Sequence, residues 1–151
     1  MTSDATSRPS RLAEPPLTQP FEGASFPAAI RRFLQNYATF RGRGSRSEFW
    51  WPTLVILLFP YAVMAINGLV TGEWRLIDTR VVQDVPEAVV VLFSLVTLLP
   101  LLAVTWRRLH DTNRTGAWFF LVFLPIIGWI ALAILLAMKG VPGANRFDVA
   151  R

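Results

Sequence analysis

The sequence predicts an all-α integral membrane protein with three transmembrane helices preceded by an amphipathic interfacial helix. Composition is the first observation behind this prediction: hydrophobic residues make up 53% of the chain and charged residues 17%, whereas about a quarter of a typical soluble domain is charged. The second is that the apolar residues gather in three unbroken runs. About 20 apolar residues suffice for a helix to cross a bilayer with its backbone groups paired internally.

Length, charge and residue usage narrow the classes of function. The chain has 151 residues, enough for one domain, and a formal net charge of +5. A basic chain favours nucleic acid or an anionic membrane surface as a partner. The apolar runs favour the membrane, and neither a basic stripe interleaved with aromatics nor zinc-finger spacing indicates nucleic acid. With no cysteine and one histidine, we expect no metal site and no cofactor.

The first segment, residues 1–24, is rich in Ser, Thr and Pro and lacks the apolar core of a signal peptide. Its few apolar residues cannot offset the entropy of ordering the chain, so we expect a disordered tail. A membrane domain over 25–148 follows, and its end overlaps a short polar tail over 139–151.

An amphipathic helix is expected over 25–40. Ser25 is a suitable N-cap, and Pro27 fits the first turn. Apolar side chains recur at helical spacing on one face, and polar side chains take the other. The apolar face comprises Phe26, Ile30, Phe33, Leu34 and Tyr37, and the polar face Arg31, Arg32, Gln35 and Asn36. Such a helix lies in the membrane interface or packs on the transmembrane helices, and the two are compatible.

The first two spans are expected over 49–70 and 86–106. Gly42 and Gly44 interrupt the preceding helix, and Ser45 or Ser47 is placed to cap the first span. Aromatic residues at its start match the belt found at membrane interfaces. Pro60 and Pro100 lie inside the spans and predict kinks. The loop between them, over 71–85, holds Trp74, Arg75 and Arg80.

The third span is expected over 117–138 as a kinked full crossing. Arginines concentrate before the first span and in the loop at 107–116, which places both on the cytoplasmic side. A full crossing carries the tail, with Lys139, Arg146 and Arg151, to the outside. A re-entrant hairpin turning at 125–128 is the alternative, and its cost is unpaired backbone groups at the turn.

A polar stretch over 106–118 joins the second and third runs. It holds three arginines, the single histidine and an aspartate. If the second helix continues through Asp111, that carboxylate lies one turn from Arg107 and Arg108. His110 and Asp111 are adjacent, so they diverge on a helix and form a poor catalytic dyad. We expect Glu48 and Asp111 to lie among Arg43, Arg46, Arg107 and Arg108.

Four motifs stand out along the chain. The first is Phe40-Arg41-Gly42-Arg43 with Arg46, Glu48, Phe49 and Trp50, and the second is the run Arg107 to Gly116. The third and fourth are Leu124 to Gly128 and Pro142 to Phe147. Together they resemble the domain of unknown function 805 family of small bacterial inner-membrane proteins. Asp148 and Ala117 depart from it, standing where the family usually has glycine and often tryptophan. The resemblance covers about residues 30–148; it implies an integral membrane protein in the inner membrane and supplies no activity.

The leading hypothesis is a multi-pass inner-membrane protein with a cytoplasmic N-terminus, whose arginine-rich cluster binds anionic phospholipid headgroups or another protein. The candidate residues are Arg43, Arg46, Glu48, Arg107, Arg108, His110, Asp111 and Arg114. An enzyme that modifies lipid headgroups with His110 is a weaker alternative, and no catalytic residue is assigned. A transporter or channel subunit is another, although the spans lack ionisable groups in their interiors. A homo- or hetero-oligomer is compatible with each of these.

Overall fold

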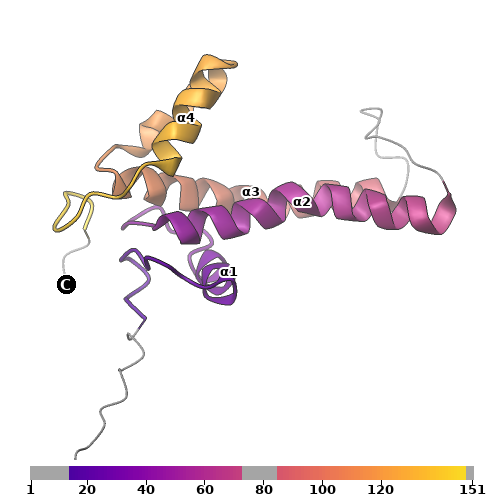
Figure 1. Cartoon of the computed structure of the whole chain (residues 1–151), viewed down its shortest axis with the longest axis horizontal. Coiled ribbons are helices and arrows are strands. Elements are labelled where there is room, and N and C mark those ends of the chain that lie inside the picture. Colours follow the sequence, from indigo (N-terminus) through magenta and orange to yellow (C-terminus); the bar gives the residue numbers. More distant parts are fainter. Residues whose placement is uncertain (1–13, 73–84, 149–151) are drawn as a thin grey trace, which may run out of the picture.

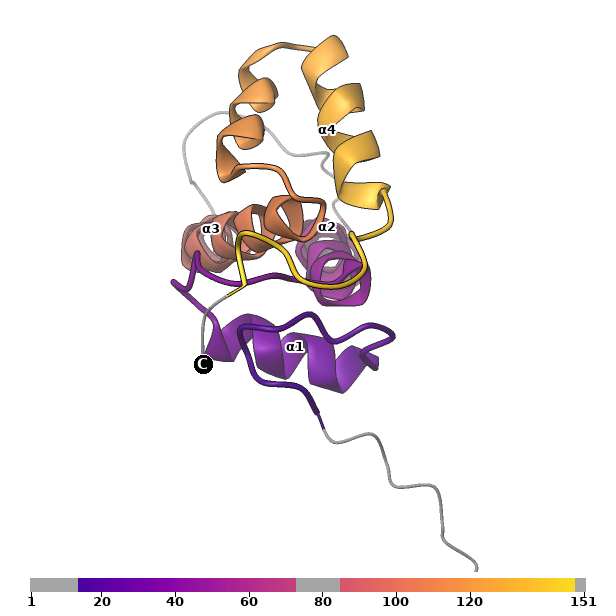
Figure 2. The same ribbon diagram turned by 90° about the vertical axis from the view of Figure 1, so that its left-hand side faces the viewer.

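The computed structural model describes residues 14–72 and 85–148, and these ranges contain helices and no strand. In chain order the elements are α1 (Phe26–Gln35), α2 (Arg46–Thr71), α3 (Val85–Asp111), the 3-10 helix η1 (Gly116–Phe123) and α4 (Ile127–Ala137). The long helices α2 and α3 lie side by side, and the other elements gather at one end of this pair (Figure 1). Viewed along the pair, α1 lies on one side and η1 with α4 on the other (Figure 2).

Helices α2 and α3 are both long and apolar enough to cross a membrane. At 1.5 Å per residue their 26 and 27 residues are each about 40 Å long, more than the hydrocarbon core of a bilayer. Leucine, valine and isoleucine side chains along both helices are exposed, as a lipid-facing surface requires. Most of the predicted 71–85 loop, with Trp74, Arg75 and Arg80, lies outside the described residues.

Helix α2 begins three residues before the predicted start because Ser45 caps it. The Ser45 hydroxyl accepts from the backbone N–H of Glu48 at 3.3 Å, and the Glu48 carboxylate accepts from the backbone N–H of Ser45 at 2.8 Å. This reciprocal capping box satisfies two backbone donors that a helix start leaves unpaired. The sequence left Ser45 and Ser47 as alternative caps, and the structure has Ser45.

Helix α3 continues five residues beyond the predicted end at Trp106 and ends at Asp111. Its end therefore carries Arg107 to Asp111, the first half of the 107–116 stretch that the sequence placed in a loop. Thr112 and Asn113 then turn the chain, with the backbone N–H of Asn113 bonded to the carbonyl of His110 at 2.9 Å. The continued helix places Arg108 and Asp111 on the same face, one turn apart.

The third apolar run is a hairpin, which corrects the prediction of one kinked crossing over 117–138. Its first leg is η1, with 8 residues, and its second leg is α4, with 11. At their respective rises per residue each leg is about 16 Å long, roughly half the hydrocarbon core. After α4 the chain returns to the end of α3, where the backbone N–H of Val141 donates to the carbonyl of Asp111 at 2.9 Å.

Backbone groups around the hairpin turn are largely paired. The cost of unpaired backbone groups, which the sequence predicted for a hairpin, is therefore small. The N–H groups of Leu124 and Gly128 donate to the carbonyls of Leu121 and Leu124 at 2.9 and 3.0 Å. The indole of Trp129 donates to the carbonyl of Val122 at 2.8 Å and so joins the two legs. Pro125 has no N–H to satisfy. This turn therefore exposes few of the unpaired groups that lipid disfavours.

Helix α1 ends at Gln35, five residues earlier than predicted, and its polar face is partly buried. Arg32 and Asn36 are 1% and 2% exposed, whereas Leu34 is 59% exposed. The side-chain amide of Asn36 donates to the carbonyl of Leu17 at 3.3 Å as the chain leaves the helix. Phe26 and Leu34 face outward, as an interfacial helix requires, whereas Phe33 is buried in the hydrophobic core.

Residues 14–24 hold a defined path against α1 and α2, which differs from the expected disordered tail; residues 1–13 lie outside the described residues. The guanidinium of Arg32 donates to the carbonyls of Pro15, Pro16 and Gln19, at 2.8, 3.1 and 2.7 Å. A buried guanidinium needs acceptors for its N–H groups. Arg32 therefore orders a segment whose composition alone predicts disorder.

Candidate functional site

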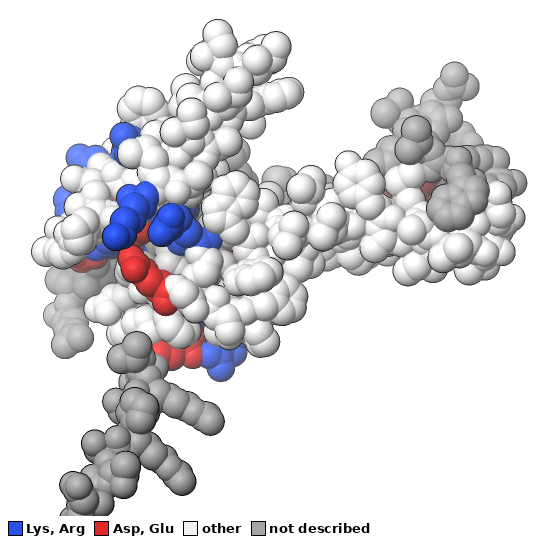
Figure 3. Space-filling model, in the orientation of Figure 1, with Lys and Arg blue, Asp and Glu red and all other residues white. Residues whose placement is uncertain are grey.

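Charged side chains gather at the end of the α2–α3 pair where α1, η1 and α4 meet. The rest of the pair carries almost none in this view (Figure 3). We call this end the polar cap. It consists of Arg32 with residues 14–24, 41–48, 107–116 and 139–148. Three of the four motifs found in the sequence lie in it, and the fourth, Leu124 to Gly128, forms the hairpin turn.

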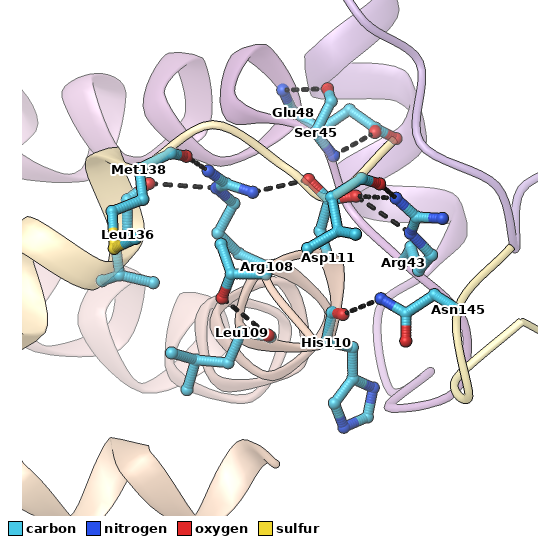
Figure 4. Close-up of polar contacts among 12 residues, drawn as sticks. Arg43, Ser45, Glu48, Arg108, Leu109, His110, Asp111, Leu136, Met138 and Asn145 are labelled. Atoms are coloured by element: carbon cyan, nitrogen blue, oxygen red, sulfur yellow. Dashed lines mark hydrogen bonds and ion pairs between the residues drawn. The ribbon is translucent and has the colours of Figure 1, made fainter. Parts of the chain in front are cut away.

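Asp111 lies between two buried arginines from different parts of the chain (Figure 4). Arg43 contacts one carboxylate oxygen through Nε and Nη2, at 3.0 and 2.9 Å. Arg108 donates to the other oxygen at 2.6 Å. Asp111 is 3% exposed, so both pairs are shielded from water. This geometry joins the loop before α2 to the last turn of α3, as the sequence predicted for these residues.

The same two arginines hold the C-terminal tail. Arg108 donates to the backbone carbonyls of Leu136, at 3.0 Å, and Met138. Arg43 donates to the carbonyls of Val141 and Gly143, at 2.6 and 2.8 Å. Their N–H groups are therefore occupied by protein acceptors. This arrangement makes Arg43 and Arg108 structural clamps rather than free groups for an anionic ligand.

Glu48, the second buried carboxylate, pairs with an arginine that the sequence analysis did not assign to the site. Its Oε1 accepts from Nε of Arg32 at 2.6 Å, and its Oε2 accepts from the backbone N–H of Phe21 at 2.9 Å. Arg32 also lies 3.4 Å from Glu14. Glu48 is thus a structural partner of α1 and of residues 14–24.

Arg107 is 1% exposed, and its Nε and Nη1 have no hydrogen-bond partner. Within the described residues the buried arginines outnumber the buried carboxylates: they are Arg32, Arg43, Arg107 and Arg108 against Glu48 and Asp111. A buried ion without full pairing is destabilising. Arg107 is therefore the least satisfied ion of the polar cap.

His110 and Asp111 face different partners, so they do not form a catalytic dyad. The Nδ1 of His110 donates to the carbonyl of Gly42 at 3.2 Å, while Asp111 contacts arginines. The imidazole stacks on the Phe147 ring, with centroids 3.9 Å apart and planes within 2°. The side chain of Asn145 donates to the carbonyl of His110 at 2.8 Å. These contacts give His110 a role in holding the tail.

The remaining two predicted residues are less constrained. Arg46 is exposed, and its side chain has no hydrogen-bond or ion-pair partner among the described residues. Arg114 is half-buried, and its closest acceptor is the carbonyl of Thr112 at 3.5 Å. Arg41 and Lys139 are exposed nearby, and Arg146 lies over the Phe147 ring with its guanidinium carbon 4.6 Å from the centroid. The cations open to a ligand are thus these peripheral ones.

Two glycines allow the segments of the polar cap to approach one another. Gly42 has φ of 81°, and a Cβ there would lie 2.5 Å from the carbonyl oxygen of Thr18. A Cβ on Gly140 would lie 2.1 Å from Oδ2 of Asp111. A side chain at either position would displace the segment packed against it.

Sequence reasoning missed Arg32 because its spacing places it on the polar face of an amphipathic helix, where exposure is the usual outcome. It also missed the backbone carbonyls of 136–143 as acceptors, since carbonyls leave no signal in a sequence. The one available signal was the excess of arginine before the first span, which implied that some guanidinium groups need internal acceptors.

Comparisons with known proteins identify the relatives of this chain. The model of a family described as "Protein of unknown function (DUF805)" matches residues 37–149. The chain is 39% identical over 114 residues to the inner membrane protein YhaI of Escherichia coli K12, covering 76% of this chain and 86% of that protein. It is 34% identical over 116 residues to the inner membrane protein YhaH of the same strain, covering 77% and 89%. No solved structure matches this chain significantly.

Proposed function

This chain belongs to the DUF805 family, and on that premise we propose that it is a small inner-membrane protein whose polar cap binds anionic phospholipid headgroups at the cytoplasmic surface. The observation that carries the proposal is the separation of charge along the molecule. Cations gather at one end of the two apolar helices α2 and α3, and the remaining length of these helices exposes apolar side chains. Arginine and lysine near a membrane favour the cytoplasmic face and anionic lipid.

The proposed topology has two full spans, α2 and α3, with the hairpin of η1 and α4 at their cytoplasmic end, where it projects to one side of the pair (Figure 1). The support is that the polar cap contains segments from before α2, after α3 and after α4, tied by Arg43, Arg108 and Asp111. All three segments must then lie on one side of the bilayer. The excess of arginine over acid at this end supports a cytoplasmic position for that side, with the N-terminus and the tail both there.

The peripheral cations carry the proposed lipid contact, because the buried arginines are occupied by protein acceptors. Arg41, Lys139 and Arg146 are exposed at the rim of the polar cap. Each basic side chain near an anionic surface contributes about 1 kcal/mol, or roughly fivefold in affinity. The attraction is screened by salt, so it should weaken as ionic strength rises.

Lipid retention by the purified full-length protein tests the proposal. After mild detergent extraction, native mass spectrometry measures how much phosphatidylglycerol and phosphatidylcholine remain bound at equal supply. We expect a preference for phosphatidylglycerol that falls in the triple variant Arg41→Gln, Lys139→Gln, Arg146→Gln. Arg31→Gln is the matched control, since this exposed arginine is already paired with Glu14. Equal retention of both lipids by the native protein, or an unchanged preference in the triple variant, would overturn the proposal.

A further inference from the structure

A cleft of about 230 Å³ opens at the polar cap between the segment before α1, the start of α2 and the chain after α4. It is lined by Glu22, Gly23, Ser45, Arg46, Ser47, Asp111 and Gly140. Four separate segments meet there, since Asp111 at the end of α3 also lines the cleft, and each is held by the hydrogen bonds described above. The cleft is therefore a built feature of the folded polar cap.

Most of the polar groups that line the cleft already form ion pairs or hydrogen bonds within the protein. Asp111 is paired with Arg43 and Arg108. The Ser45 hydroxyl donates to the carbonyl of Phe21 at 2.7 Å, and the Ser47 hydroxyl accepts from the backbone N–H of Ala24 at 3.0 Å. None of these groups needs a ligand to satisfy it.

Two charged side chains of the lining have no ion-pair partner. Glu22 and Arg46 are both exposed, and neither has an ion-pair partner among the residues that the structure describes. They do not pair with each other within 4.0 Å, although they line one cleft. A molecule that carries both an anionic and a cationic group would satisfy both at once, with charge-assisted hydrogen bonds at each end.

The position of the cleft along α2 corresponds to the headgroup layer of a membrane. Trp50 and Trp51 follow Ser45–Ser47 by about one helical turn, or roughly 5–9 Å along the axis. Both indoles are exposed, at 44% and 39%. Tryptophan is enriched at the boundary between headgroups and hydrocarbon. The cleft lies on the polar side of this boundary, where phospholipid headgroups are found.

We propose that this cleft binds one zwitterionic headgroup that carries a phosphate and a primary amine, as in phosphoethanolamine. The phosphate contacts the Arg46 guanidinium, and the ammonium donates to the Glu22 carboxylate. A trimethylammonium group fits less well because it has no N–H to donate, and the lining has no aromatic ring to replace that hydrogen bond. The inference uses the membrane placement of the proposed function, but not its preference for anionic lipid.

Native mass spectrometry of the full chain, supplied with equal phosphatidylethanolamine, phosphatidylcholine and phosphatidylglycerol, tests this assignment. We expect the native protein to retain one phosphatidylethanolamine in preference to phosphatidylcholine. Glu22→Gln should lower that preference by roughly tenfold, since it removes a charge-assisted hydrogen bond, and should leave phosphatidylcholine retention unchanged. Arg46→Gln should lower the retention of all three lipids at this site. Arg31→Gln, at an exposed arginine outside the cleft that is already paired with Glu14, should change none.

The same preparation distinguishes the source of the headgroup. Displacement of the lipid by millimolar O-phosphoethanolamine would assign the site to a soluble amine phosphate with the same chemistry. Equal displacement by inorganic phosphate would overturn the role of the amine. The proposal also fails if Glu22→Gln keeps the native preference for phosphatidylethanolamine over phosphatidylcholine. Loss of phosphatidylglycerol preference in the triple rim variant, with the Glu22 effect intact, separates this cleft from the broader anionic surface.

Discussion

The hydroxyl of Tyr37 donates to the backbone carbonyl of Val96, in the middle of α3. Four residues further along α3 lies Pro100, which has no N–H. The carbonyl of Val96 therefore lacks the donor that an ordinary helix would supply. In a membrane such an unpaired carbonyl is costly, so a side chain from outside the helix takes the place of the missing N–H. This contact also fixes the chain after α1 against the second span.

Replacing Tyr37 by Phe should destabilise the protein by about 0.5–1.5 kcal/mol, the usual net contribution of one hydrogen bond. The reason is that the carbonyl of Val96 is left without a donor. The free energy of unfolding in detergent micelles, measured for both proteins, checks this value.

Pro100→Ala provides the control for that prediction. Alanine restores the N–H that bonds the carbonyl of Val96 within the helix. In the Pro100→Ala background, Tyr37→Phe should therefore cost distinctly less. Equal costs in the two backgrounds would mean that the hydroxyl does not compensate for the proline.

Arg107 and Arg108 are adjacent and both buried, yet substituting each of them by Met should lower the free energy of unfolding by very different amounts. Arg108→Met leaves Asp111 with one partner fewer and removes the donors to Leu136 and Met138, so a loss of about 3–5 kcal/mol is expected. Arg107→Met removes a guanidinium whose Nε and Nη1 are unpaired and should cost much less. Chemical unfolding of the two variants compares them directly, and a similar cost for both would contradict the assignment.

Asp111→Asn should release the C-terminal tail from the polar cap. The substitution leaves Arg43 and Arg108 without their shared counter-ion, at a cost of about 3–5 kcal/mol. Limited proteolysis should then cut the chain after α4 faster than in the native protein. Asp148→Asn is the control, because Asp148 is 38% exposed and 3.5 Å from Arg43, and exposed pairs contribute roughly 0–1 kcal/mol. Unchanged proteolysis in Asp111→Asn would disprove the clamp.

The two ends of the described chain should lie on the same side of the membrane. The chain contains no cysteine, so single cysteines placed at Arg41, Thr71 and Asn145 report accessibility without background. In spheroplasts, an impermeant maleimide should label position 71 directly and positions 41 and 145 only after permeabilisation. Labelling of position 145 in intact spheroplasts, with position 41 protected, would restore a third crossing in place of the hairpin.

Several contacts of the polar cap could be predicted from the sequence. The capping box of Ser45 and Glu48 and the pair of Arg108 and Asp111 depend on positions three apart, so helical geometry predicts both. The pair of Arg43 and Asp111 joins positions 68 apart; the prediction that these residues lie together followed from placing both motifs at the cytoplasmic ends of the spans. Arg32 could not be assigned in this way, because its face of α1 is covered by residues 14–24, a segment with no recognisable pattern.

Composition and run length by themselves determined that this protein is helical and that the first two apolar runs are long enough to cross a membrane, but they also predicted a third crossing. These properties follow from local hydrogen bonding and from transfer of apolar side chains out of water. Tertiary structure decided the course of the third apolar run. A straight helix and a hairpin bury similar apolar groups, but only the hairpin returns the carbonyls of Leu136, Met138, Val141 and Gly143 to Arg43 and Arg108. Buried guanidinium groups require such acceptors, and no sequence pattern marks which carbonyls supply them.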